Sequence, residues 1–111
     1  MINDFLESKV FDELKQSVGS DFALELVSTF LDEAPKMLAD LRASFSSKDV
    51  EPFRRTAHSL KTNSLTFGAR ALAEYARKLE LTGLPADPSD LDQLESIYFE
   101  TEKALRTLSN G

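Results

Sequence analysis

The chain has 111 residues, a formal charge of −6 at pH 7 and no cysteine. This length suits one domain with a single hydrophobic core. The lack of cysteine excludes disulfides, thiolate chemistry and cysteine-based zinc sites, and it fits the reducing cytoplasm. The acidic balance argues against a nucleic-acid or anionic-membrane partner, because both require a basic face. We therefore expect a cytoplasmic protein that binds other proteins.

No secretory leader opens the sequence, and no apolar run approaches the roughly 18 residues that span a bilayer. An initiating Met1 close to the first predicted helix favours a free-standing protein over a segment of a larger one. We expect no membrane association.

The first predicted helix is short and covers residues 4–17. Asp4 or Ser8 is its candidate N-cap, and Gly19 is its predicted stop, because glycine readily adopts the backbone conformation that ends a helix. We expect this helix to cover one end of the domain.

The second predicted helix covers residues 21–45, about seven turns. Apolar residues repeat along it at spacings of four and three, which is typical of a helix with one buried face. Pro35 lies inside it and predicts a bend rather than a break.

The third and fourth predicted helices form a hairpin. The third covers residues 49–67, has Asp49 as its candidate N-cap and ends at Gly68. The fourth covers residues 69–82, and so short a connection makes the two helices antiparallel neighbours. A stripe of small and apolar side chains on the third helix is predicted to face the core: Phe53, Ala57, Leu60, Ser64 and Phe67.

The last predicted helix covers residues 88–108, with Asp87 as its cap and Pro88 as its first residue. The sequence contains no strand pattern and no internal repeat. Four long amphipathic helices and a short one predict an all-α fold. We expect an antiparallel up-and-down four-helix bundle with a short additional N-terminal helix, as one domain over residues 1–111.

The only histidine, His58, lies just beside the buried stripe of the third helix. The neighbouring strip of that helix consists of Arg54, His58, Lys61, Thr62 and Leu65. The imidazole is therefore predicted at the edge of the core, with the Lys61 ammonium one turn away. Imidazole is an effective nucleophile near neutral pH, so His58 is the candidate reactive residue.

Glu80 is predicted to lie beside His58. The two residues stand ten and twelve positions from Gly68, about 15 and 18 Å along their helices. The Glu80 carboxylate can then accept a hydrogen bond from Nδ1 of His58 and leave Nε2 free. Glu80 could equally pair with Arg77 or Lys78 at the surface, which would contribute little.

From His58 to Leu72 the sequence has the pattern His-x-Leu-Lys-x-x-Ser-x-x-x-Gly-Ala-x-x-Leu, and Leu79-Glu80 follow. This pattern resembles the signature of histidine-containing phosphotransfer (HPt) domains, the phosphocarriers of multistep two-component relays. The resemblance covers nearly the whole chain. It implies that His58 takes a phosphoryl group from the aspartyl phosphate of one receiver domain and passes it to another, with Lys61 pairing with the phosphoryl oxygens. It also implies that Mg²⁺ belongs to the partner receiver and that this chain holds no metal or cofactor.

One residue departs from the family pattern, because HPt domains usually have glycine directly after the lysine and this chain has Thr62. Arg54, Thr62 and Leu65 are the predicted partner-binding residues around His58. Thr62 adds bulk beside the imidazole and is predicted to tune partner choice or transfer rate without abolishing transfer.

Two other functions are weighed against a phosphocarrier. A helical adaptor that binds receiver domains without transfer would have no reason to keep His58 together with Lys61. An enzyme with His58 as general base or metal ligand would lack a second catalytic group or ligand set. No nucleotide motif is present, so we expect no autokinase activity. The apolar stripes close on one bundle, which predicts a monomer.

Overall fold

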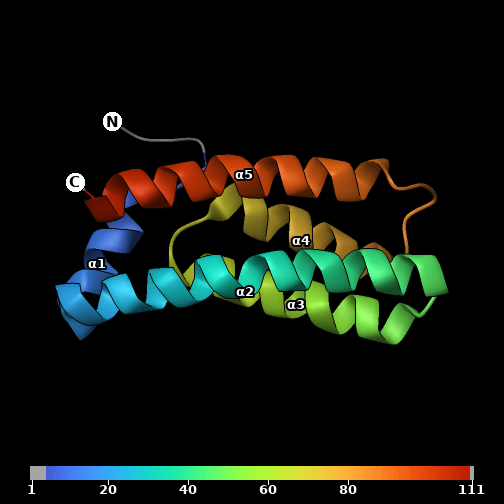
Figure 1. The fold of residues 1–111 in the computed structure, drawn as a ribbon, viewed down its shortest axis with the longest axis horizontal. Helices are drawn as coiled ribbons and strands as arrows, with labels where there is room; N and C mark the ends of the chain where they lie inside the picture. Colours follow the sequence, from blue (N-terminus) through green and yellow to red (C-terminus); the bar gives the residue numbers. More distant parts are fainter. Residues whose placement is uncertain (1–4, 111) are drawn as a thin grey trace.

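A computed structural model describes residues 5–110 of the chain. It contains five helices in chain order: α1 (Ser8–Val18), α2 (Ser20–Ser47), α3 (Val50–Thr66), α4 (Arg70–Thr82) and α5 (Ser89–Asn110). Figure 1 shows α2 to α5 running alternately along the long axis, with α1 across one end. The predicted all-α bundle with a short N-terminal helix is confirmed.

The order of the helices around the bundle decides which surfaces lie opposite one another. α3 packs against α2 and α4, and α5 packs against the same two helices. α3 and α5 are therefore diagonal, and the α3–α4 hairpin forms one layer while α2 and α5 form the other. One continuous hydrophobic core lies between the layers, and its fully buried side chains include Leu41, Phe53, Leu79 and Leu94.

The first helix begins later than predicted, at Ser8 rather than at residue 4. Glu7 occupies the N-cap position without a side-chain cap, and Asp4 lies outside the described residues. The backbone N–H of Glu7 donates to the carbonyl of Gly68 at 2.8 Å. This segment is thus held across the α3–α4 connection, and its backbone donor is satisfied there instead of within a helical turn.

The connection after α3 requires glycine for two reasons. Gly68 has φ +75°, in the left-handed region that favours glycine. A β-carbon at this position would also lie 2.8 Å from the carbonyl oxygen of Glu7 and 2.8 Å from Cβ of Val10. Gly68 therefore ends the helix and lets the start of α1 approach closely.

The other helix ends lie within two residues of the predicted bounds. α2 continues through Pro35 and stops where Lys48 turns left-handed with φ 60°. Asp49 occupies the N-cap position of α3 as predicted, but its carboxylate accepts from Ser47 Oγ at 3.0 Å instead of capping the helix. Only Gly19 separates α1 from α2.

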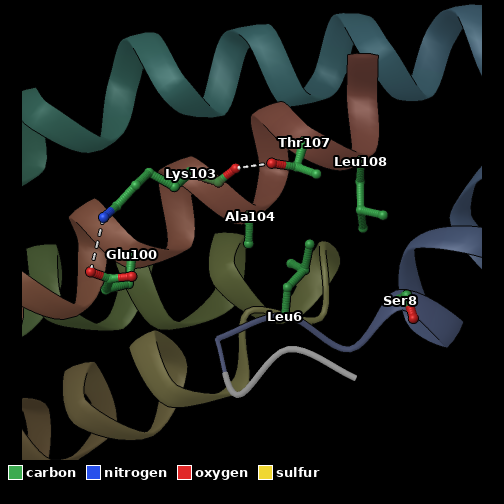
Figure 2. Close-up of a pocket in the computed structure, with 7 residues that line it drawn as sticks. All are labelled: Leu6, Ser8, Glu100, Lys103, Ala104, Thr107 and Leu108. Carbon is green, nitrogen blue, oxygen red and sulfur yellow. Dashed lines mark hydrogen bonds and ion pairs between the residues drawn. The ribbon is translucent and has the colours of Figure 1, made fainter. Parts of the chain in front are cut away.

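The start of the described chain lies against its last helix. Leu6 and Ser8 line a shallow pocket of about 260 Å³ together with five residues of α5: Glu100, Lys103, Ala104, Thr107 and Leu108. Figure 2 shows the Leu6 side chain directed toward Ala104 of α5. Within residues 5–110, no helix is both long and apolar enough to cross a bilayer.

Candidate functional site

α3 presents His58 to solvent because its neighbouring stripe is buried. All five residues of the predicted core stripe are at most 4% exposed: Phe53, Ala57, Leu60, Ser64 and Phe67. The one polar member, Ser64, is satisfied because its hydroxyl donates to the Leu60 carbonyl at 2.6 Å. With this stripe fixed in the core, the adjacent strip must face outward, and the His58 side chain is 57% exposed.

The α3–α4 hairpin brings Glu80 beside His58, as the spacing predicts. Nδ1 of His58 lies 2.9 Å from Oε2 of Glu80. An ionised carboxylate can only accept a hydrogen bond, so Nδ1 is the protonated nitrogen. No hydrogen bond within the described chain involves Nε2, and in the neutral ring this nitrogen carries the free lone pair.

The second oxygen of Glu80 pairs with Lys61. Nζ of Lys61 lies 3.2 Å from Oε1, an ion pair that the sequence did not predict. Burial raises the pKa of the Glu80 carboxyl, but the contacts with Lys61 and His58 lower it by more, so the pKa lies below its ordinary value. The carboxylate is therefore ionised at neutral pH and connects the imidazole to the ammonium.

Neither of the alternative partners, Arg77 and Lys78, forms an ion pair with Glu80 in the described chain. Nζ of Lys78 lies 4.0 Å from Asp90, and its ammonium stands 4.9 Å from the centre of the Tyr75 ring. Arg77 forms no ion pair with any residue that the structure describes. The antiparallel register explains the outcome, because Lys61 lies on the strip of α3 that faces Glu80 and both alternatives lie on α4 itself.

This arrangement supplies an exposed nucleophile with a fixed orientation. The carboxylate holds the imidazole by Nδ1, which restricts the ring and directs Nε2 away from α4. A cation lies within one helical turn of the nucleophile and can neutralise negative charge that develops there. The site therefore suits attack on an electrophile that arrives on another molecule.

The three residues predicted to bind a partner lie on the same exposed strip. Arg54 and Thr62 are exposed, and Leu65 is 55% exposed. Arg54 extends over the end of α4, because a β-carbon at Gly83 would lie 3.3 Å from its Nη2 atom. The sequence did not predict this contact, because Gly83 is at least seventeen residues from α3 along the chain and has the features of an ordinary loop glycine.

No cluster of three or more potential metal ligands from His, Cys, Asp or Glu occurs in residues 5–110. The histidine has one carboxylate neighbour, which already accepts its Nδ1 proton. Among the described residues, the side-chain partner of the His58 ring is thus this one carboxylate, at Nδ1.

Comparison with known proteins places this chain in a family. The sequence model of the Hpt domain matches residues 25–109. The phosphorelay protein LuxU of Vibrio harveyi is 25% identical, and the match covers 99% of this chain and all of LuxU.

Two solved structures share the fold. Histidine-containing phosphotransfer protein B (HptB) from Pseudomonas aeruginosa PAO1 superposes with a TM-score of 0.90 at 26% identity, over 98% of this chain and 97% of HptB. The HPT domain of a sensor hybrid histidine kinase from Shewanella has a TM-score of 0.72 at 17% identity, over 88% of this chain and 90% of that domain, and supports the fold alone. Since the family model covers more than half of the sequence, the chain belongs to the Hpt domain family.

Proposed function

We propose that this protein is a histidine phosphocarrier of a two-component phosphorelay, which accepts a phosphoryl group on His58 and passes it on. One observation carries the proposal: an exposed imidazole is held through Nδ1 by an ionised carboxylate, with a lysine beside it. The names of its relatives, a phosphorelay protein and a histidine-containing phosphotransfer protein, support the same function.

The transfer is a displacement at phosphorus. Nε2 of His58 attacks the phosphorus of an aspartyl phosphate, the new N–P bond forms, and the P–O bond to the aspartate breaks and releases a carboxylate. The ring keeps its Nδ1 proton and becomes positively charged, and the Glu80 carboxylate stabilises that charge. Lys61 pairs with the phosphoryl oxygens. The reverse sequence of bonds delivers the group to a second aspartate.

The partners are then receiver domains, which carry the reacting aspartate. They also supply Mg²⁺, which neutralises charge on the phosphoryl oxygens, so the carrier needs no cofactor of its own. We propose that the chain has no ATP site and no autokinase activity and that its phosphate comes from another protein. Its cysteine-free composition suits the reducing cytoplasm. We propose that it works there as a monomer.

The docking surface includes Arg54, Thr62 and Leu65. They surround His58 on one strip of α3, and Leu65 offers an exposed apolar contact in the middle of polar neighbours. Thr62 lies next to Lys61, where its side chain limits how closely a partner can approach the imidazole.

The decisive experiment tests whether His58 carries phosphate. The purified protein is incubated with a phosphorylated receiver domain, and acid-labile, alkali-stable phosphate is measured on wild type and on His58→Gln. We expect label on the wild type and none on the variant, because glutamine has no nucleophilic nitrogen. Ser59→Ala, at the exposed neighbour of His58, is the matched control and is expected to keep the label.

A protein that binds several receivers and takes no label from any of them would instead be the helical adaptor. Label that survives in His58→Gln would place the phosphate on another residue. Either result would contradict the proposed role of His58.

A further inference from the structure

Charged residues are distributed unevenly between the two layers of the bundle. α3 and α4 contain six basic and three acidic residues, a formal charge of +3 in a chain whose total is −6. α2 and α5 contain four basic and ten acidic residues, a formal charge of −6. The layer that carries His58 is therefore basic, and the opposite layer is acidic.

The two layers also differ in how their basic residues are paired. Every cation of α2 and α5 has an acidic partner within 4.0 Å: Lys36, Arg42, Lys103 and Arg106. Three arginines of the basic layer are exposed and form no ion pair within the described part of the chain: Arg54, Arg55 and Arg77. Positive charge in this layer is thus left available to another molecule.

Two of these arginines flank the reactive histidine. Arg54 precedes His58 by one turn of α3, and Arg77 precedes Glu80 by one turn of α4. The contacts of His58 with Glu80 and of Arg54 with Gly83 set the antiparallel register, which puts Arg77 level with Lys61. One unpaired guanidinium group therefore lies on each side of the His58–Glu80 pair along the hairpin.

We propose that Arg54 and Arg77, together with Lys61, form a basic docking face that recognises an acidic surface of the protein exchanging phosphoryl groups with His58. This inference rests on the proposed phosphocarrier function. The two unpaired arginines near the nucleophile raise the local concentration of an acidic partner, and the acidic layer of α2 and α5 disfavours the wrong orientation. A protein surface fits this face better than a nucleic acid, because a few cations on a chain of net charge −6 are too sparse for a phosphate backbone.

The test compares two double variants with the same net charge. Arg54→Gln with Arg77→Gln removes two cations from the basic layer, and Lys103→Gln with Arg106→Gln removes two from α5. The second-order rate constant for transfer from a phosphorylated acidic receiver domain is measured between about 0.01 M and about 0.5 M salt. The maximal rate at saturating receiver is measured in parallel, and circular dichroism verifies that both variants are folded.

We expect the hairpin variant to lower the second-order rate constant about tenfold at low salt and to leave the maximal rate unchanged. The difference in second-order rate constant between the hairpin variant and wild type is expected to shrink at high salt. The reason is that the screening length falls from about 30 Å at 0.01 M to about 3 Å at 1 M. The α5 variant is expected to stay within about twofold of wild type at every salt concentration.

Equal losses in both double variants, or a loss that does not depend on salt, would overturn the docking face. A lower maximal rate with an unchanged salt dependence would assign the arginines to the transfer step and would also overturn it. So would binding to duplex DNA or anionic vesicles that the hairpin variant alone loses. If the wild type takes no phosphate at all, the phosphocarrier proposal fails, and titration of the receiver against each variant at low and high salt still tests the face.

Discussion

Glu80 is the residue whose surroundings were only half predictable from the sequence. Its distance from Gly68 matches that of His58, so helical geometry alone indicated their contact. The ion pair with Lys61 depends on how far the two helices are rotated about their axes, which residue spacing does not report. For the same reason, the approach of Arg54 to Gly83 became visible only in the folded hairpin.

Replacing Glu80 tests whether it positions the imidazole. We expect Glu80→Ala to lower the rate of phosphoryl transfer to His58 by roughly 10- to 100-fold, the range that applies when a carboxylate orienting a metal-binding histidine is lost. Glu80→Gln keeps an oxygen that can accept from Nδ1, so most of the rate is expected to return. The measurement is single-turnover transfer from a phosphorylated receiver. Equal rates in all three proteins would remove this role from Glu80.

The same glutamine variant has a stability signature with a known sign. The pKa of Glu80 is lowered in the folded protein, so its ionised form stabilises the fold at pH values above its ordinary pKa. This contribution to stability is lost as the pH falls through the lowered pKa of Glu80. The gap in unfolding free energy between wild type and Glu80→Gln is therefore expected to be constant near neutral pH and to close in acid. Urea denaturation at a series of pH values measures it.

The hairpin is the element that the sequence specifies most fully. A buried stripe at helical spacing, a glycine stop and an immediate restart determine two antiparallel helices, and the structure contains both within two residues of their predicted bounds. The predicted start of α1 at residue 4 was wrong, because Phe5 and Leu6 extend an apolar pattern that is typical of a helix. A backbone hydrogen bond to Gly68, distant in sequence, holds this segment outside the helix.

Gly68→Ala is expected to destabilise the fold more than backbone strain alone would. The left-handed conformation costs a residue with a β-carbon about 1–2 kcal/mol. The added methyl group would also meet Glu7 and Val10 at 2.8 Å, so the start of α1 must move. We expect a total loss of roughly 3 kcal/mol in unfolding free energy, measured by urea denaturation. A loss that stays within the strain range would indicate that the α1 segment yields freely.

At the scale of the whole molecule, the charge separation between layers was present in the sequence but could not be assigned to faces. The net charge of −6 describes the chain correctly and conceals a basic layer of +3. Only the packing of the helices shows that α3 and α4, which carry this positive charge, form one layer with His58 and lie opposite the acidic layer of α2 and α5. Composition alone therefore argued against nucleic-acid and anionic-membrane partners, but it did not indicate where a basic docking face would lie.

We expect the protein to be a monomer at micromolar concentration. The large exposed apolar residues are spread over all five helices, with at most two on each: Val18, Phe22, Leu24, Val50, Leu65, Leu81 and Phe99. Scattered apolar residues do not make the contiguous patch that a stable dimer interface requires. Sedimentation velocity is expected to give one species with the mass of a single chain. A dimer in this range would contradict the expectation.

The pocket at the end of the bundle has a consequence for how such a domain can be combined with others. Leu6 and Ser8 from the start of the described chain and Leu108 from its end line the same hollow, so the polypeptide enters and leaves the bundle at one pole (Figure 2). His58 lies partway along α3, away from that entry point. Neighbouring entry and exit points are what circular permutation and insertion into a host loop require. The bundle can therefore be carried as a side branch of a larger polypeptide while its reactive face stays open to solvent.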